Sequence, residues 1–143
     1  MPVIPKAKVF LDSSVFIAAA ISPRGHARTL LLRGLRGEEA LFVSELVLVE
    51  TERNLARKAP RALAAFDIFR EMLAQQIVYP SKELVEDCLL VVASKDAPIV
   101  AGARAAEAAW IVSYDQKHLL NQHERIRECF GILVATPEEY LSG

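Results

Sequence analysis

Four acidic residues stand where apolar segments of the chain begin or end. Asp12 and Asp115 each follow a short apolar run, KVFL and WIVSY. Asp96 precedes an alanine-rich segment, and Glu50 stands where an apolar stretch becomes charged. Carboxylates held close together repel one another, so they protonate or bind a cation. Ligation by oxygen alone favours Mg²⁺ or Mn²⁺, which activate water and neutralise charge on a phosphodiester. If the four residues converge, they predict hydrolysis of nucleic acid.

The strands that must carry Asp12 and Asp115 are predicted for residues 8–12 and 110–113. Both segments are short and almost wholly apolar, which favours strands buried on both faces of a sheet. In open α/β sheets, ligands bind beyond the carboxyl ends of the strands, where both aspartates fall. Similar apolar runs predict further strands at residues 40–44, 76–79 and 132–135.

Asp96 suits the N-cap of a helix that runs over residues 97–108. Its carboxylate can accept hydrogen bonds from the unpaired amides of the first turn, and Pro98 is tolerated there. Apolar residues recur at intervals of three and four along this segment, as on a helix with one buried face. By itself, this pattern explains Asp96 as an ordinary helix cap.

Glu50 lies within a helix predicted for residues 45–58. The helix begins almost wholly apolar and ends almost wholly charged, so Glu50 should project from the edge of the buried face. Glu52 is a rival for the same role, and an isolated glutamate on a helix is usually solvated. Other helices are predicted for residues 15–22, 26–35, 61–75 and 83–88, with partly helical turns over 117–130 and a short helix at the end of the chain.

The order of these elements predicts an α/β fold. A helix that feeds a buried strand implies a crossover between parallel strands, and such crossovers are nearly always right-handed. We expect a single domain over residues 1–143, with four or five parallel strands and helices on both faces. Its length and its 52% content of hydrophobic residues suffice for one core.

Composition limits the classes of function. A formal net charge of −1 means that nucleic acid would have to bind at local basic patches. No apolar run approaches the ~20 residues that span a bilayer, so we expect a soluble, cytoplasmic protein. Cys88 and Cys129 are widely separated, which is typical of reduced cysteines in a core. The clearest basic cluster is Arg24, Arg28, Arg33 and Arg36.

Four motifs in order resemble the PIN domain: VFLDSSVF, LVLVETERNL, SKDAPIVAGARAAEAAWIVSYDQKHLL and GILVATPEEYL. The resemblance covers nearly the whole chain and is closest to the small single-domain members that form the toxin part of toxin–antitoxin pairs. It implies a ribonuclease dependent on Mg²⁺ or Mn²⁺ that cuts RNA. It also implies a small antitoxin protein as partner and a homodimer.

The resemblance assigns roles by position. Asp12, Glu50, Asp96 and Asp115 match the acidic quartet of the family. The three aspartates would contact the metal directly or through water, and Glu50 would orient or deprotonate the attacking water.

Ser14 and Ser113 stand where the family usually has a small hydroxyl or amide residue that supports the first and last acids. Their short side chains suit hydrogen bonding to a neighbouring carboxylate. Ordinary capping and strand-end roles are the alternative for both serines.

Other interpretations of the sequence remain open. A non-catalytic PIN-like module that binds RNA or a partner would keep the same fold without turnover. An Asp-based phosphotransfer domain would need an acid two residues after Asp12, where this chain has Ser14. His118 and His123 have a spacing seen in zinc sites, but no cysteine pair accompanies them, which favours surface histidines.

Overall fold

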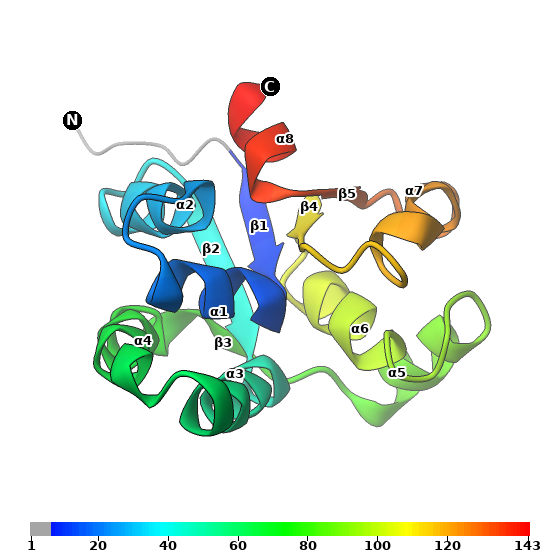
Figure 1. Ribbon diagram of the computed structural model, residues 1–143. Coiled ribbons are helices and arrows are strands. Elements are labelled where there is room, and N and C mark those ends of the chain that lie inside the picture. The colour runs from blue at the N-terminus through cyan, green and yellow to red at the C-terminus, as the bar shows by residue number, and fades with distance from the viewer. Residues whose placement is uncertain (1–6) are drawn as a thin grey trace.

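Five parallel strands form the centre of the molecule, in the order β3-β2-β1-β4-β5 (Figure 1). The computed structural model describes residues 7–143, so residues 1–6 of the expected domain lie outside it. The predicted parallel sheet is confirmed. The strands are β1 (Lys8–Leu11), β2 (Ala40–Ser44), β3 (Ile77–Val78), β4 (Trp110–Val112) and β5 (Leu133–Ala135). The helices are α1 (Ser13–Ile21), α2 (His26–Leu35), α3 (Glu45–Lys58), α4 (Leu63–Met72), α5 (Lys82–Leu89), α6 (Ala97–Ala105), α7 (His123–Phe130) and α8 (Pro137–Ser142).

Helices cover both faces of the sheet, as expected. Helices α1, α2 and α4 lie on one side of the strands, and α5, α6 and α7 lie on the other (Figure 1). Among residues 7–143, no helix has the length and hydropathy needed to cross a membrane.

The direction of winding reverses between β1 and β4. The chain passes from β1 outward through β2 to β3, then returns across the sheet and continues through β4 to β5. Strand β1 therefore pairs with β2 on one side and β4 on the other, with Leu11 opposite Val112. Crevices in open α/β sheets form at such a reversal, beyond the carboxyl ends of the strands. The residues that follow Leu11 and Val112 stand at its edge.

Helix α6 packs very close to β1, because it presents a glycine to the strand. A Cβ atom on Gly102 would lie 2.6 Å from Cζ of Phe10, whose side chain is fully buried. Since real Cβ atoms do not approach other atoms so closely, a larger residue at this position would force the helix or the ring to move. The lack of a side chain at residue 102 thus allows α6 to lie close to β1, and the position of the helix in turn fixes where its first residues lie relative to the sheet edge.

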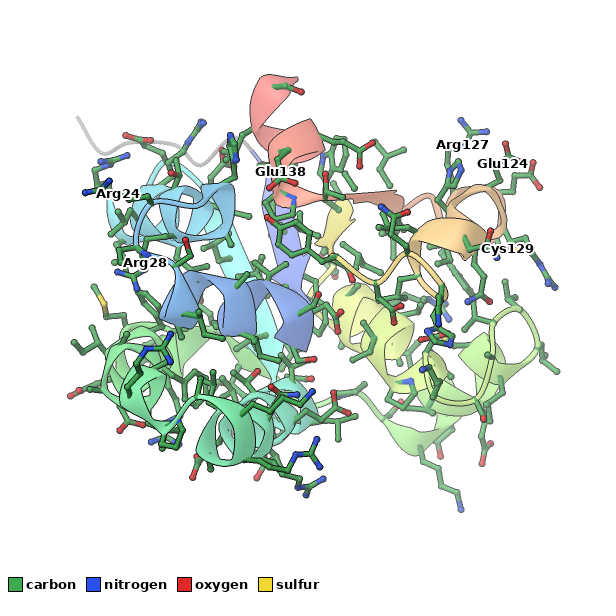
Figure 2. All side chains as sticks on the ribbon, in the orientation of Figure 1. Arg24, Arg28, Glu124, Arg127, Cys129 and Glu138 are labelled. Atoms are coloured by element: carbon green, nitrogen blue, oxygen red, sulfur yellow. The ribbon has the colours of Figure 1, made fainter. Side chains whose placement is uncertain are left out.

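Several predicted boundaries are wrong. The helix expected over residues 97–108 ends at Ala105, and Glu107 turns the chain with a positive φ of 56°. The helix expected over 61–75 is α4 flanked by two short 3₁₀ turns, Pro60–Ala62 and Ala74–Gln76. Cys129, expected in the core, is exposed on α7 (Figure 2), whereas Cys88 is buried as expected.

Candidate active site

The four acids expected to act together line one pocket at the carboxyl edge of the sheet. The pocket has a volume of about 510 Å³. Asp12 directly follows β1, Asp115 lies three residues beyond β4, Glu50 comes from α3 and Asp96 precedes α6. Four separate segments therefore contribute carboxylates to a cavity at the point where the sheet reverses its winding.

Asp12 is almost completely buried and is held by two serines. Its Oδ2 accepts hydrogen bonds from the hydroxyls of Ser14, at 3.0 Å, and Ser113, at 2.8 Å. The serine hydroxyls also accept, Ser14 from the amide of Tyr114 and Ser113 from the amide of Asp115, each at 2.9 Å. The two serines therefore connect the first acid to the segment that carries the last one. Neither acts as a helix cap.

The pKa of Asp12 is raised above its ordinary value. Burial is the main cause, the nearby charge of Asp115 adds to it, and the hydrogen bonds from Ser113 and Ser14 oppose it. The pKa of Glu50 is also raised, first by burial and then by the charge of Asp12. Desolvation and mutual repulsion therefore make the negative charge of this pocket costly, and a cation would relieve that cost.

Asp96 does not cap α6 with its side chain, contrary to the sequence-based expectation. An N-cap carboxylate accepts from the second or third amide of the helix. Here the second residue is Pro98, which has no N–H, and the amide of Ile99 already donates to the main-chain carbonyl of Asp96. Asp96 is buried, with only 3% of the residue exposed. Its carboxylate instead accepts a hydrogen bond from Nε2 of Gln122 at 3.1 Å.

Asp115 lies beside His118, for which the sequence favoured a surface position. Nδ1 of His118 lies 3.0 Å from Oδ1 and 3.1 Å from Oδ2 of Asp115, and the His118 amide donates to Oδ1 at 3.3 Å. The spacing of three residues was a signal, because a turn beginning with aspartate often bonds back to its own later residues. Gln122, the partner of Asp96, had no comparable local signal.

The two glutamates of α3 have separate environments. Glu50 lines the pocket, whereas the exposed Glu52 forms an ion pair with Arg70, with 2.7 Å between Oε2 and Nη1. Residues two apart on a helix point in widely different directions, so only one of them can face the sheet edge. This contrast provides a matched pair of side chains for mutagenesis.

The basic cluster of Arg24, Arg28, Arg33 and Arg36, on and beside α2, does not border the pocket. Arg28 donates to the carbonyl of Ala19 at 2.6 Å and stacks over Phe69, while Arg33 pairs with the buried Glu39 at 3.1 Å. Arg24 and Arg28 project beside α2 (Figure 2). Among the described residues that line the pocket, the one basic side chain is that of Lys95.

The donor set suits a hard divalent cation that keeps part of its water shell. Within residues 7–143, no three Asp, Glu, His or Cys side chains lie close enough together to hold a metal ion by themselves. Mg²⁺ usually retains several waters and takes only one or two carboxylates directly, so it does not require such a cage. The raised pKa values of the buried Asp12 and the half-buried Glu50, and the lack of a thiol among the lining residues, fit this ion and disfavour zinc.

Comparison with known protein families agrees with this geometry. The model of the PIN domain matches residues 9–123, which include all four acids of the pocket. The chain belongs to the PIN domain family. PIN domains are generally nucleases that use divalent metal ions, so this chain has the fold and family of enzymes that hydrolyse phosphodiester bonds.

Solved structures share the PIN fold over most of their length. VapBC2 from Rickettsia felis, bound to a DNA fragment from its promoter, is 15% identical with a TM-score of 0.64, covering 89% of this chain and 96% of that one. FitAcB from Neisseria gonorrhoeae is 14% identical with a TM-score of 0.64, covering 91% and 98%. PAE2754 from Pyrobaculum aerophilum is 14% identical with a TM-score of 0.60, covering 94% and 88%. No curated protein matches the sequence significantly. At these identities the likeness shows the fold alone.

Proposed function

We propose that this protein is a single-domain endoribonuclease that depends on Mg²⁺ or Mn²⁺. The observation that carries the proposal is the convergence of Asp12, Glu50, Asp96 and Asp115 on one pocket at the winding reversal of a PIN fold. The raised pKa values of Asp12 and Glu50 support it, because like charges brought close together and partly desolvated are typical of functional sites, including those that bind a cation.

Each of the four acids has a proposed part in the reaction. Asp12, Asp96 and Asp115 would hold the metal ion directly or through water. The bound ion would neutralise charge on the phosphodiester and lower the pKa of a water. Glu50 accepts a proton from the attacking water, and its raised pKa brings it nearer to neutrality, where a general base is most effective. The serine hydroxyls keep the carboxylate of Asp12 oriented.

A matched pair of α3 variants tests the proposal. Glu50→Gln is expected to lower kcat for cleavage of single-stranded RNA by about 100-fold, the usual contribution of a general base. Glu52→Gln, which changes an exposed acid two residues away, should cleave at the parental rate. Cleavage is followed on a labelled RNA with Mn²⁺, and EDTA should abolish it. Equal rates for the parent and Glu50→Gln would mean that the activity is a contaminant.

Lys95 is expected to contact a phosphate of the RNA, because its side chain lines the acidic pocket. Lys95→Met should raise KM for RNA by about fivefold and make binding less dependent on salt, with little change in kcat. It should also move the pH profile of cleavage upward, since Lys95 lowers the pKa of Glu50. Lys82→Met, at an exposed position of α5, serves as control. An unchanged KM and salt dependence would exclude this role.

We further propose that the protein is the toxin of a toxin–antitoxin pair, that it binds a small antitoxin, and that it forms a homodimer. The resemblance of its motifs to small PIN toxins supports this. Light scattering should therefore give about twice the chain mass of 15.8 kDa. Co-expression with the product of a small adjacent reading frame should yield a complex that no longer cleaves RNA. A monomer at all concentrations would contradict the dimer.

A non-catalytic RNA-binding module is the second candidate. It is favoured by the absence, in residues 7–143, of three ligands already gathered around one point. Titration with Mn²⁺ by calorimetry separates the two proposals. An enzyme should bind Mn²⁺ and lose that binding in Asp96→Asn, whereas a binding module should retain RNA affinity and give no heat with Mn²⁺.

A further inference from the structure

Gln122 connects the two sides of the acidic pocket through its side-chain amide. Its Nε2 donates to Oδ2 of Asp96 at 3.1 Å and to the main-chain carbonyl of His118 at 2.9 Å. Its Oε1 accepts from the amide of Ala93 at 3.4 Å. The side chain of Gln122, which lies 26 residues beyond Asp96 in sequence, thus forms hydrogen bonds with three partners. They are Ala93 in the segment before α6, Asp96 at the start of α6, and His118 in the segment after β4.

The contacts of Gln122 extend to Asp115 through His118. The main-chain carbonyl of His118 accepts a hydrogen bond from Gln122. The ring and the amide of the same histidine contact the carboxylate of Asp115. Asp96 and Asp115, which lie in different crossovers, are therefore linked by hydrogen bonds through the side-chain amide of Gln122 and through His118.

Local structure does not otherwise orient Asp96. Its carboxylate makes no cap to α6, because Pro98 has no N–H and the amide of Ile99 is bonded elsewhere. Gln122 is its one side-chain hydrogen-bond donor among the described residues. An amide suits this task, because it donates to a carboxylate without a positive charge that would compete with a cation.

We propose that Gln122 is a positioning residue that holds Asp96 and the segment of Asp115 in the arrangement that binds the metal. This inference rests on the proposed function, since it assumes that both aspartates bind Mg²⁺ or Mn²⁺. Gln122 need not contact the ion or the RNA. It acts by limiting how far the two carboxylates move apart when the pocket holds no cation.

The test compares Gln122→Met with the parent and with Asn121→Leu. Methionine keeps the length of the side chain and removes both donors, and Asn121 is the exposed neighbour of Gln122. Mn²⁺ affinity, measured by calorimetry, should fall by about 10- to 100-fold in Gln122→Met, the usual effect of losing a residue that orients a ligand. Asn121→Leu should bind Mn²⁺ like the parent.

Cleavage kinetics separate positioning from a general loss of structure. In Gln122→Met, the Mn²⁺ concentration for half-maximal RNA cleavage should rise by the same factor, while saturating Mn²⁺ should restore most of kcat and leave KM for RNA unchanged. Thermal melts in EDTA should match those of Asn121→Leu. Parental Mn²⁺ affinity in Gln122→Met would overturn this inference alone. Failure of the parent to bind Mn²⁺ would overturn both the inference and the proposed function.

Discussion

Asp12→Asn is expected to reduce metal-dependent RNA cleavage by roughly 1000-fold, because it removes a negative charge from the proposed metal site. Asparagine is nearly isosteric, and its side-chain oxygen can still accept from the hydroxyls of Ser14 and Ser113. The pocket should therefore keep its shape and lose only its charge. Single-turnover cleavage with Mn²⁺ measures the loss. A residual rate within a few-fold of the parent would remove Asp12 from the proposed mechanism.

The same substitution is expected to stabilise the metal-free protein at neutral pH. The pKa of Asp12 is raised on folding above its ordinary value of 3.8, mainly by burial. Between the unfolded and folded pKa values the native state binds more protons, so its stability falls as pH rises through this range. Asparagine avoids this cost, so Asp12→Asn should melt above the parent in EDTA at pH 7; each gain of about 1 kcal/mol would raise the melting temperature of a domain of this size by roughly 3 °C.

Thermal melts from pH 3 to pH 8 check the sign of this effect. The advantage of Asp12→Asn should be largest near neutrality and disappear below the ordinary carboxyl pKa, where Asp12 is protonated in both states. Asp87→Asn, at an exposed position of α5, should show no such gain. If Asp12→Asn melts below the parent at pH 7, its carboxylate is stabilising and the pocket is not strained by charge.

Gly102→Val is expected to lower the free energy of unfolding by about 3 kcal/mol, the upper range for overpacking a core. A Cβ at residue 102 would lie 2.6 Å and 2.8 Å from two ring atoms of Phe10. That ring is fully buried and has little space to turn into, so we expect α6 to move away from β1. The displacement should carry Asp96 with it and weaken Mn²⁺ binding as well.

Ala105→Val provides the control for Gly102→Val. Residue 105 is exposed on the same helix, so valine costs only its lower helix propensity there, about 0.5 kcal/mol. Urea denaturation of both variants gives the free energies of unfolding, and calorimetry gives the Mn²⁺ affinities. Equal stability of the two variants would show that α6 has room beside β1 and that its position does not depend on the glycine.

Local signals in the sequence determined much of the fold. The predicted bounds of β2, α2 and α3 agree with the structure. Ser44 caps α3 by accepting from the amide of Val47. Caps, turns and apolar periodicity are written in adjacent residues, so they can be recognised without a partner. For the same reason, the positions of Asp12 and Asp115 at the ends of buried strands were evident from the chain alone.

Tertiary structure decided which partner each polar side chain found. The hydrogen bond from Ser113 to Asp12 joins residues 101 positions apart, and that from Gln122 to Asp96 joins residues 26 apart. No local pattern contains both members of such a pair. Local sequence patterns therefore explained Asp96 equally well as a helix cap, left Glu50 and Glu52 as rivals for one role, and did not show whether the basic cluster of Arg24, Arg28, Arg33 and Arg36 lies beside the acids.

Local sequence does not determine these partners, because the preference of a side chain for a cap or turn competes with hydrogen bonds and packing contacts made by residues distant in sequence. Asp96 stands where a side chain commonly caps a helix, but Pro98 has no N–H to donate to it, and packing places Gln122 within hydrogen-bonding distance of its carboxylate. The sequence by itself determined that acids stand at the ends of strands and at the start of a helix. Only the folded chain, by reversing its winding between β1 and β4, brought those acids to one pocket and selected the residues that orient them.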